Sequence, residues 1–199
     1  MGRRPTRIGL FGGTFDPVHT AHLEVAEAVR EDLGLDRMLL VVANQPWQKE
    51  GARPVTPAED RWAMVEAALA DHPGLEASRI EIDRGGPSYT IDTVRQLHAA
   101  HPDAELFVVV GSDVVAGLPT WRHEDELRHE ATLAVVTRPG APLTAAPAGW
   151  RTLYVPVAPR DVSSTGLRDR LEAGEPVDGL VPEDVMRCIL QRGLYATGR

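Results

Sequence analysis

Short continuous runs of apolar residues alternate along the chain with longer stretches in which apolar residues recur at helical spacing. Continuous apolar runs are typical of strands that are covered on both faces of a parallel sheet. We expect such strands at residues 7–11, 38–43, 80–82, 106–110, 133–136 and 153–155. The stretches with helical spacing predict helices at residues 22–33, 56–70, 89–100, 164–172 and 182–192.

This alternation predicts an α/β fold with a doubly wound parallel sheet and a small C-terminal helical part. We expect one domain over residues 1–199, with residues 160–199 as a helical subdomain. Residues 138–149 are rich in Pro, Ala and Gly and predict a flexible connection. Thr56, followed by Pro57 and Glu59, has the pattern of a capping box, which predicts a helix with Thr56 as its N-cap.

Composition and charge narrow the classes of function. The chain has 199 residues and a net charge of -8, from 21 Lys and Arg against 29 Asp and Glu. This acidic balance argues against a nucleic-acid-binding protein. The single cysteine, Cys188, excludes an internal disulfide and fits a reducing compartment. Because we see neither a signal peptide nor an apolar run of roughly 20 residues, we expect a cytoplasmic protein without a membrane partner.

The segment Gly12–His22 follows the first expected strand and contains a glycine pair and two histidines. Glycines let the backbone approach a ligand closely, and the next helix start offers free N–H groups and the positive end of its dipole, which suits a triphosphate. His19 and His22 share a helix face and can donate to phosphate oxygens. Glycine pairs are also common after strands, and the two histidines could instead be a metal pair or surface residues. No third metal ligand is evident nearby, so we expect no metal held by the protein itself.

A second candidate phosphate element lies in residues 161–168. The hydroxyl residues Ser163, Ser164 and Thr165 precede a helical pattern and mark a helix start with unpaired N–H groups. Arg168 lies one turn further on and can reach the same opening, which would complete an anion site. The alternative is an ordinary N-cap followed by a solvent-exposed arginine.

Both segments resemble motifs of one enzyme family. The run GGTFDPVHTAHL resembles the first motif of the bacterial nicotinate-mononucleotide adenylyltransferases, members of the nucleotidyltransferase superfamily with the phosphate motif H-x-G-H. Ala21 departs from that motif, where the superfamily has glycine. The run DVSSTGLR is similar to the second family motif, I-S-S-T-x-x-R, with Val162 in place of isoleucine.

The resemblance implies a Rossmann-like nucleotidyltransferase fold and transfer of AMP from ATP to nicotinate mononucleotide. Catalysis would then depend on His19, His22 and Arg168. ATP would be bound by Gly12, Gly13, Thr14, Phe15, His19, His22, Gly111, Asp113, Arg138, Ser163, Ser164, Thr165 and Arg168. Mg²⁺ would enter bound through the nucleotide phosphates.

The resemblance also suggests which residues select the second substrate. Nicotinate mononucleotide would be bound by Asn44, Lys49, Ser88, Tyr89, Thr90, Asp113, Trp121 and Arg122. Among these, Thr90 would help to bind the nicotinate carboxylate and Trp121 would stack on the pyridine ring. Each has a plainer interpretation: Ser88, Thr90 and Asp113 could be helix caps, and the aromatic side chains could be core. Arg138 could lie in a surface turn.

Several alternatives stay open from the sequence. A sister enzyme of the same superfamily could use nicotinamide mononucleotide or phosphopantetheine, although the segment 88–93 and Trp121 argue against the latter. The fold could also serve as a non-catalytic nucleotide-sensing domain, which the presence of both histidines and Arg168 disfavours. A tRNA-synthetase core is disfavoured by the acidic charge. The sequence also leaves the oligomeric state open, with a homo-oligomer as one option.

Overall fold

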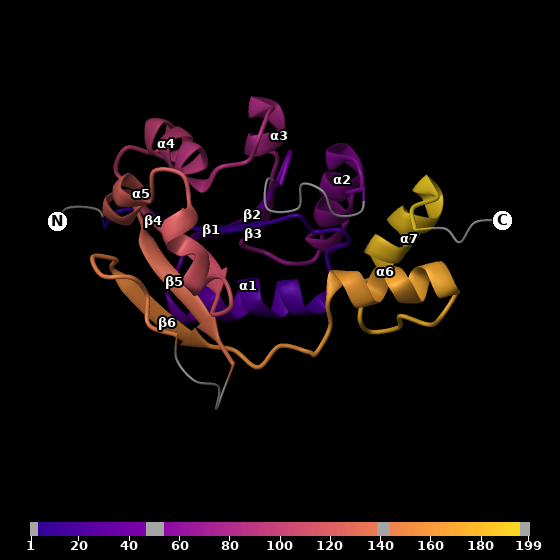
Figure 1. Cartoon of the computed structure of the whole chain (residues 1–199). Coiled ribbons are helices and arrows are strands. Elements are labelled where there is room, and N and C mark those ends of the chain that lie inside the picture. Colours follow the sequence, from indigo (N-terminus) through magenta and orange to yellow (C-terminus); the bar gives the residue numbers. More distant parts are fainter. Residues whose placement is uncertain (1–3, 47–53, 139–143, 196–199) are drawn as a thin grey trace.

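A six-stranded parallel sheet forms the centre of the molecule, in the order β3-β2-β1-β4-β5-β6 (Figure 1). The structure is a computed structural model and describes residues 4–46, 54–138 and 144–195. Its strands are β1 (Arg7–Gly13), β2 (Arg37–Val42), β3 (Leu75–Ser78), β4 (Glu105–Gly111), β5 (Thr132–Thr137) and β6 (Thr152–Pro156). Its helices are α1 (Thr20–Asp32), α2 (Ala58–Ala68), α3 (Ile80–Arg84), α4 (Thr90–Ala100), the 3₁₀ helix η2 (Val115–Thr120), α5 (Glu124–Glu130), α6 (Ser164–Ala173) and α7 (Glu183–Arg192).

Helices cover both faces of the sheet because its central strands are apolar on both sides. In β4, Phe107 and Val109 join a buried cluster with residues of α1, α2, α6 and α7. Leu106, Val108 and Val110 of the same strand join a second cluster with α4, α5 and η2. Successive side chains of a strand point to opposite faces, so one continuous apolar run supplies both clusters. The expected α/β fold with a doubly wound parallel sheet is confirmed.

The order of the strands reverses at β1, which lies between β2 and β4. The chain leaves β1 toward β2 on one side and later returns to β4 on the other. In open α/β sheets of this kind, a crevice forms beyond the carboxyl ends of the strands at such a reversal. The fold therefore brings together the segments that follow residues 13 and 111.

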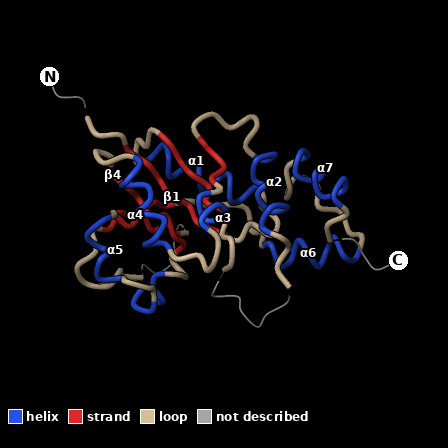
Figure 2. The backbone as a smooth tube through the Cα atoms, turned by 90° about the horizontal axis from the view of Figure 1, so that it is seen from above, coloured by secondary structure: helices blue, strands red, loops and turns tan. Residues whose placement is uncertain are grey.

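The C-terminal helices α6 and α7 lie at the opposite end of the molecule from α5 in both views (Figures 1 and 2). Helix α7 packs against α2. Apolar residues of the two helices, among them Leu167, Val185 and Ile189, belong to the same buried cluster as α1 and α2. This shared core fixes α6 beside the sheet. The expected helical subdomain at 160–199 stays a prediction.

The prediction of a strand at 80–82 is wrong. Ile80 and Ile82 lie in helix α3, and the edge strand β3 precedes them at Leu75–Ser78. This strand pairs only with β2 and has the mostly polar sequence LEAS, so it carries no continuous apolar run. Ile80 and Ile82 instead pack from one turn of helix. Ile80 contacts the buried cluster that includes the apolar residues of α4.

The predicted capping box at Thr56 is also wrong. Helix α2 begins at Ala58 with Pro57 as its N-cap, and no side chain caps it. The backbone N–H of Thr56 instead donates to Asp16 Oδ2 at 3.4 Å. Tertiary contact with the loop after β1 thus replaces the local cap. Across the described ranges, no helix has the length and apolar character needed to cross a membrane.

We predict that Gly9→Ala lowers the stability of the fold. A Cβ atom at this buried position of β1 would lie 2.7 Å from Met38 Sδ and 2.8 Å from Leu35 Cδ1. Such overpacking costs about 2 kcal/mol, which for a domain of this size lowers the unfolding temperature by about 4–8 °C. Thermal unfolding followed by circular dichroism measures the shift. In the control Gly117→Ala the added Cβ meets nothing within 4 Å, so a shift equal to that of Gly9→Ala would contradict the packing account.

Candidate active site

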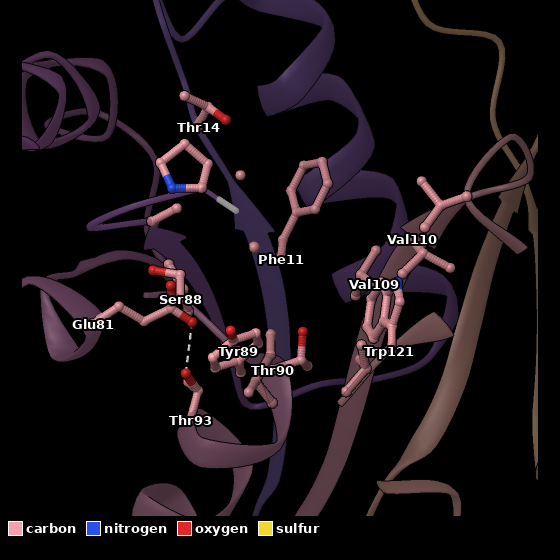
Figure 3. A pocket seen from close by; sticks show the side chains of 18 of the residues that line it. Phe11, Thr14, Glu81, Ser88, Tyr89, Thr90, Thr93, Val109, Val110 and Trp121 are labelled. Carbon is pink, nitrogen blue, oxygen red and sulfur yellow. Dashed lines mark hydrogen bonds between the residues drawn. The ribbon is translucent and has the colours of Figure 1, made fainter. Parts of the chain in front are cut away.

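A cavity of about 260 Å³ lies at the carboxyl ends of β1 and β4, where the strand order reverses (Figure 3). Gly12, Gly13 and Thr14 line it on the side of β1. In Figure 3, Ser88 and Glu81 lie on one side of the cavity and Trp121 lies on the other, beside Val109 and Val110. This position and size suit part of a nucleotide-sized ligand.

The two glycines of the loop after β1 have different physical roles. A Cβ on Gly13 would lie 2.7 Å from the ring of Phe15, so this glycine makes room for a buried aromatic side chain. A Cβ on Gly12 would meet nothing within 4 Å, because this glycine faces open space. Phe15 itself has a positive φ of 51° and packs edge-on against Phe11 and His22. Gly13 thus shapes the loop, and Gly12 leaves its backbone accessible.

His19 and His22 stack on each other at the start of α1, with ring centroids 3.7 Å apart. The backbone N–H of His19 donates to His22 Nδ1 at 3.2 Å, which assigns the ring proton of neutral His22 to Nε2. His19 is only 5 % exposed, and burial lowers its pKa to about 4. His19 is therefore neutral at pH 7, and its buried Nδ1 has no hydrogen-bond partner among the described residues.

The second candidate phosphate element meets this loop directly. Arg168 Nη1 donates to the carbonyl of Asp16 at 2.6 Å, and Ser164 Oγ donates to the carbonyl of Pro17 at 3.0 Å. The first pair of residues is 152 positions apart in the sequence. Arg168 is only 6 % exposed, and its Nε has no partner in the described part of the chain. A buried cation with an unpaired donor beside a glycine loop is suited to an anionic ligand.

The three hydroxyl groups at the start of α6 differ in what they can still donate. Ser164 uses its proton on Pro17. Ser163 Oγ accepts from the backbone N–H of Gly166 at 3.2 Å, and Thr165 Oγ1 accepts from Arg168 Nη2 at 3.0 Å. Because a hydroxyl that accepts keeps its proton, Ser163 and Thr165 can still donate to a phosphate oxygen.

Asp16 is a buried residue of the candidate site that the sequence patterns did not single out. Its carboxylate is 3 % exposed and accepts from the Tyr195 hydroxyl at 2.5 Å and from the backbone of Thr56. Burial acts to raise the pKa of Asp16, but the hydrogen bonds from Thr56 and Tyr195 outweigh it and hold the pKa below its ordinary value. Asp16 therefore stays ionised and is already bonded within the protein. In the described part of the chain, no group of three His, Cys, Asp or Glu residues could hold a metal ion.

Arg61 was missed as well. This side chain is 1 % exposed and donates to three backbone carbonyls, those of Thr56 at 2.7 Å, Thr14 at 2.8 Å and Asn44 at 3.1 Å. Thr14 follows β1 and Asn44 follows β2, so one guanidinium ties together the ends of two neighbouring strands. An arginine inside a helical pattern carries no spacing signal that would reveal this role.

The part of the cavity away from the loop after β1 contains most of the residues expected around the pyridine ring. Tyr89, Thr90, Trp121 and Arg122 all line it, and Figure 3 shows Tyr89 and Thr90 between Ser88 and Trp121. The guanidinium of Arg122 lies 4.8 Å from the centroid of the Tyr89 ring. Trp121 Nε1 is buried without a partner among the described residues. Two aromatic rings, a hydroxyl and a cation can together accommodate a flat anionic ring.

The remaining predicted residues lie around this cavity. Ser88 lines it and accepts from the backbone N–H of Asn44 at 2.8 Å. Gly111 also lines it, and the exposed Asp113 places its carboxylate over that glycine. Arg138 is exposed and lies 3.9 Å from Asp161, away from the cavity lining. Lys49 lies outside the described residues.

Glu81 contributes a buried carboxylate to the cavity that we did not predict. It accepts from the Thr93 hydroxyl at 2.6 Å (Figure 3). Arg84 Nη2 lies 3.8 Å from the same oxygen. The erroneous strand at 80–82 hid this residue, because helix α3, which contains Glu81, was not expected.

Comparisons with known proteins agree with this geometry. Residues 10–170 match a family model described as cytidylyltransferase-like. A protein of Corynebacterium kroppenstedtii named probable nicotinate-nucleotide adenylyltransferase is 46 % identical over 192 residues, covering 95 % of this chain and 90 % of its own. A relative of the same name from Thermus thermophilus is 46 % identical over 95 % of this chain and 99 % of its own.

Solved structures show a similar fold. The nicotinic acid mononucleotide adenylyltransferase of Plasmodium falciparum complexed with NaAD superposes with a TM-score of 0.78. It is 16 % identical, and the match covers 96 % of this chain and 97 % of that chain. At this identity the likeness concerns the fold, whereas the close relatives define the family. The chain therefore belongs to the nicotinate-nucleotide adenylyltransferase family, within the cytidylyltransferase-like proteins.

Proposed function

We propose that this chain transfers AMP from ATP to nicotinate mononucleotide, giving deamido-NAD and pyrophosphate. The observation that carries the proposal is the contact between Arg168 and the loop after β1, next to a cavity lined by Trp121, Tyr89 and Thr90. Arg168 and the loop after β1 suit the triphosphate, and the cavity beside them suits a pyridine nucleotide. The names of the close relatives support the same reaction.

In the proposed reaction an oxygen of the nicotinate mononucleotide phosphate attacks the α-phosphorus of ATP. The new phosphorus–oxygen bond forms as the bond between the α-phosphorus and the bridging oxygen breaks, and pyrophosphate leaves. The attacking phosphate is already ionised at neutral pH, so no protein nucleophile or general base is needed. The contribution of the protein is to position the two substrates and to stabilise the charge that develops.

The groups around the loop differ in how they can stabilise that charge. Arg168 is the buried cation, and its positive charge lies beside the loop that would receive the phosphates. His22 would donate to a phosphate oxygen from Nε2, because its Nδ1 accepts from the backbone N–H of His19. His19 is neutral, since burial lowers its pKa to about 4, and acts as a hydrogen-bonding group rather than a charge. The hydroxyls of Ser163 and Thr165 complete the proposed donor set.

Mg²⁺ belongs to the proposal as a companion of ATP. The one carboxylate of the loop, Asp16, is already bonded to Tyr195 and Thr56, so it fits poorly as a direct ligand. When bound, the ion would neutralise part of the phosphate charge, and phosphate oxygens and water would hold it. We also include a cytoplasmic location, because the reaction consumes ATP and the single cysteine suits a reducing compartment.

The proposed specificity for the acid depends on the aromatic part of the cavity. Trp121 would stack on the pyridine ring, and the Thr90 hydroxyl would donate to the nicotinate carboxylate. Arg122, already placed over the Tyr89 ring, supplies a positive charge on the same side. A carboxamide has no negative charge to pair with this arginine, so nicotinamide mononucleotide should bind less well.

The direct test is release of pyrophosphate from ATP and Mg²⁺ with nicotinate mononucleotide or nicotinamide mononucleotide as the second substrate. We expect kcat/KM at least about tenfold higher for the acid, which corresponds to about 1.4 kcal/mol. Equal or reversed preference would keep the adenylyl transfer but refute the specificity. Binding of ATP without release in either reaction would favour the nucleotide-sensing alternative.

We predict that Gly12→Ala weakens the use of ATP without weakening the fold. The added methyl would enter open space at the loop rather than a packed side chain. It would therefore obstruct the close approach of a phosphate, and we expect the KM for ATP to rise about tenfold. Steady-state kinetics and the unfolding temperature measure the two effects. Gly13→Ala is the contrasting variant, since its methyl meets the Phe15 ring and should lower the unfolding temperature. An unchanged KM in Gly12→Ala would remove Gly12 from the phosphate site.

We predict that His22→Ala loses far more turnover than substrate binding. A donor that acts on the developing charge contributes about 10²-fold to kcat. The measurement is kcat and KM for both substrates, with His129→Ala on the exposed side of α5 as a control. A kcat within about threefold of the unmodified protein would show that His22 does not have the assigned role.

A further inference from the structure

The C-terminal end of the described chain reaches the loop after β1 (residues 14–19), the proposed phosphate loop, through a hydrogen bond. Tyr195 follows α7 and donates from its hydroxyl to Asp16 Oδ1 at 2.5 Å, across 179 positions of sequence. The same hydroxyl lies 3.9 Å from Met64 Sδ in α2. Helix α7 packs against α2, and Arg192 pairs with Asp60 at 2.6 Å, so the end of α7 is held in place.

The proton in this hydrogen bond belongs to Tyr195. Burial and the bond to Asp16 raise the pKa of Tyr195, and hydrogen bonds hold the pKa of Asp16 below its ordinary value. Tyr195 therefore stays a protonated donor, and Asp16 stays an ionised acceptor. A bond from a donor to a buried carboxylate is stronger than one between neutral groups, and its loss leaves the carboxylate oxygen without that donor.

The side chain and the backbone carbonyl of Asp16 together connect Tyr195 to Arg168, the proposed catalytic arginine. The carboxylate accepts from Tyr195, and the backbone carbonyl of the same residue accepts from Arg168 at 2.6 Å. Because the carboxylate and the carbonyl belong to one buried residue, the bond from Tyr195 helps to fix the residue whose carbonyl orients the guanidinium. A displacement of only about 1 Å at a catalytic group can reduce a rate about 10²-fold.

We propose that Tyr195 is a positioning residue for adenylyl transfer, acting through Asp16 on the placement of Arg168 and the phosphate loop. This inference rests on the proposed function. Tyr195 itself does not line the described cavity, so it acts without touching the pyridine nucleotide. Its effect should consequently fall on turnover and on the use of ATP and leave the pyridine subsite unchanged.

The test is Tyr195→Phe, which removes the hydroxyl and keeps the ring. We expect kcat to fall about tenfold or more and the KM for nicotinate mononucleotide to stay within about twofold. Two control variants accompany it. Tyr154→Phe removes a tyrosine hydroxyl that bonds the backbone of Ala146 in another part of the molecule. Arg192→Gln removes a contact between α7 and α2 but keeps Tyr195. Both should retain kcat within about twofold.

A double-mutant cycle separates positioning from a general loss of stability. In the background Asp16→Ala, which removes both carboxylate oxygens, Tyr195→Phe should change kcat by less than about twofold, because the acceptor of the Tyr195 hydroxyl is already absent. Independent, multiplying effects of the two substitutions would overturn the proposal, as would an unchanged kcat in Tyr195→Phe alone. If Asp16→Ala does not fold, the comparison of Tyr195→Phe with Arg192→Gln decides, since a merely structural role would give these two variants the same loss.

Binding measurements keep this inference distinct from the proposed function. Calorimetric titration with ATP and Mg²⁺ requires no turnover, and Tyr195→Phe should weaken this binding about threefold or more relative to Tyr154→Phe. If the unmodified protein binds ATP without forming product, the proposed function is wrong. The effect of Tyr195→Phe on ATP binding can still be measured by calorimetry. If the unmodified protein is active and Tyr195→Phe matches it in both kcat and ATP affinity, only the positioning role fails.

Discussion

The burial of charge beside the loop after β1 is the constraint on which the site depends. Arg61, Arg168 and Asp16 are all almost fully buried, and each must find partners inside the protein. Arg61 is satisfied by carbonyls from the ends of β1 and β2 and the start of α2. Asp16 is satisfied by Thr56 and Tyr195. These partners come from segments that are far apart in the sequence, so only the complete fold satisfies the charges.

Arg168 differs from the other two buried charges because part of its hydrogen-bonding capacity remains unused. Its Nη atoms donate to the Asp16 carbonyl and the Thr165 hydroxyl, and its Nε has no partner among the described residues. The buried Nδ1 of His19 is likewise unpartnered there. Unsatisfied buried polar groups cost free energy in the folded protein. Both atoms lie beside the loop after β1, so the proposed phosphate site combines satisfied buried charges with unused hydrogen-bonding capacity.

The sequence predicted those parts of the molecule whose signals are local. The central strands have continuous apolar runs, so β1, β2, β4 and β5 were expected close to their observed positions. The edge strand β3 was missed because contact with only one neighbour leaves it mostly polar. The glycines and histidines of residues 12–22 were recognisable because their spacing is fixed by one loop and one helix start. Arg61 and Tyr195 could not be found in this way, because their contacts are created by the packing of α2 and α7 against distant segments.

The division of the site along the chain has a consequence for its assembly. The proposed pyridine side of the cavity is built from residues within 81–122, which fold onto the central strands of the sheet. The proposed phosphate side also needs Arg168 and Tyr195, which follow the last strand. During synthesis from the N-terminus, the pocket proposed for the ring can therefore form before the groups proposed to hold and position the triphosphate exist. A partly synthesised chain would have an incomplete phosphate site, and transfer competence would arise only when the two C-terminal helices dock.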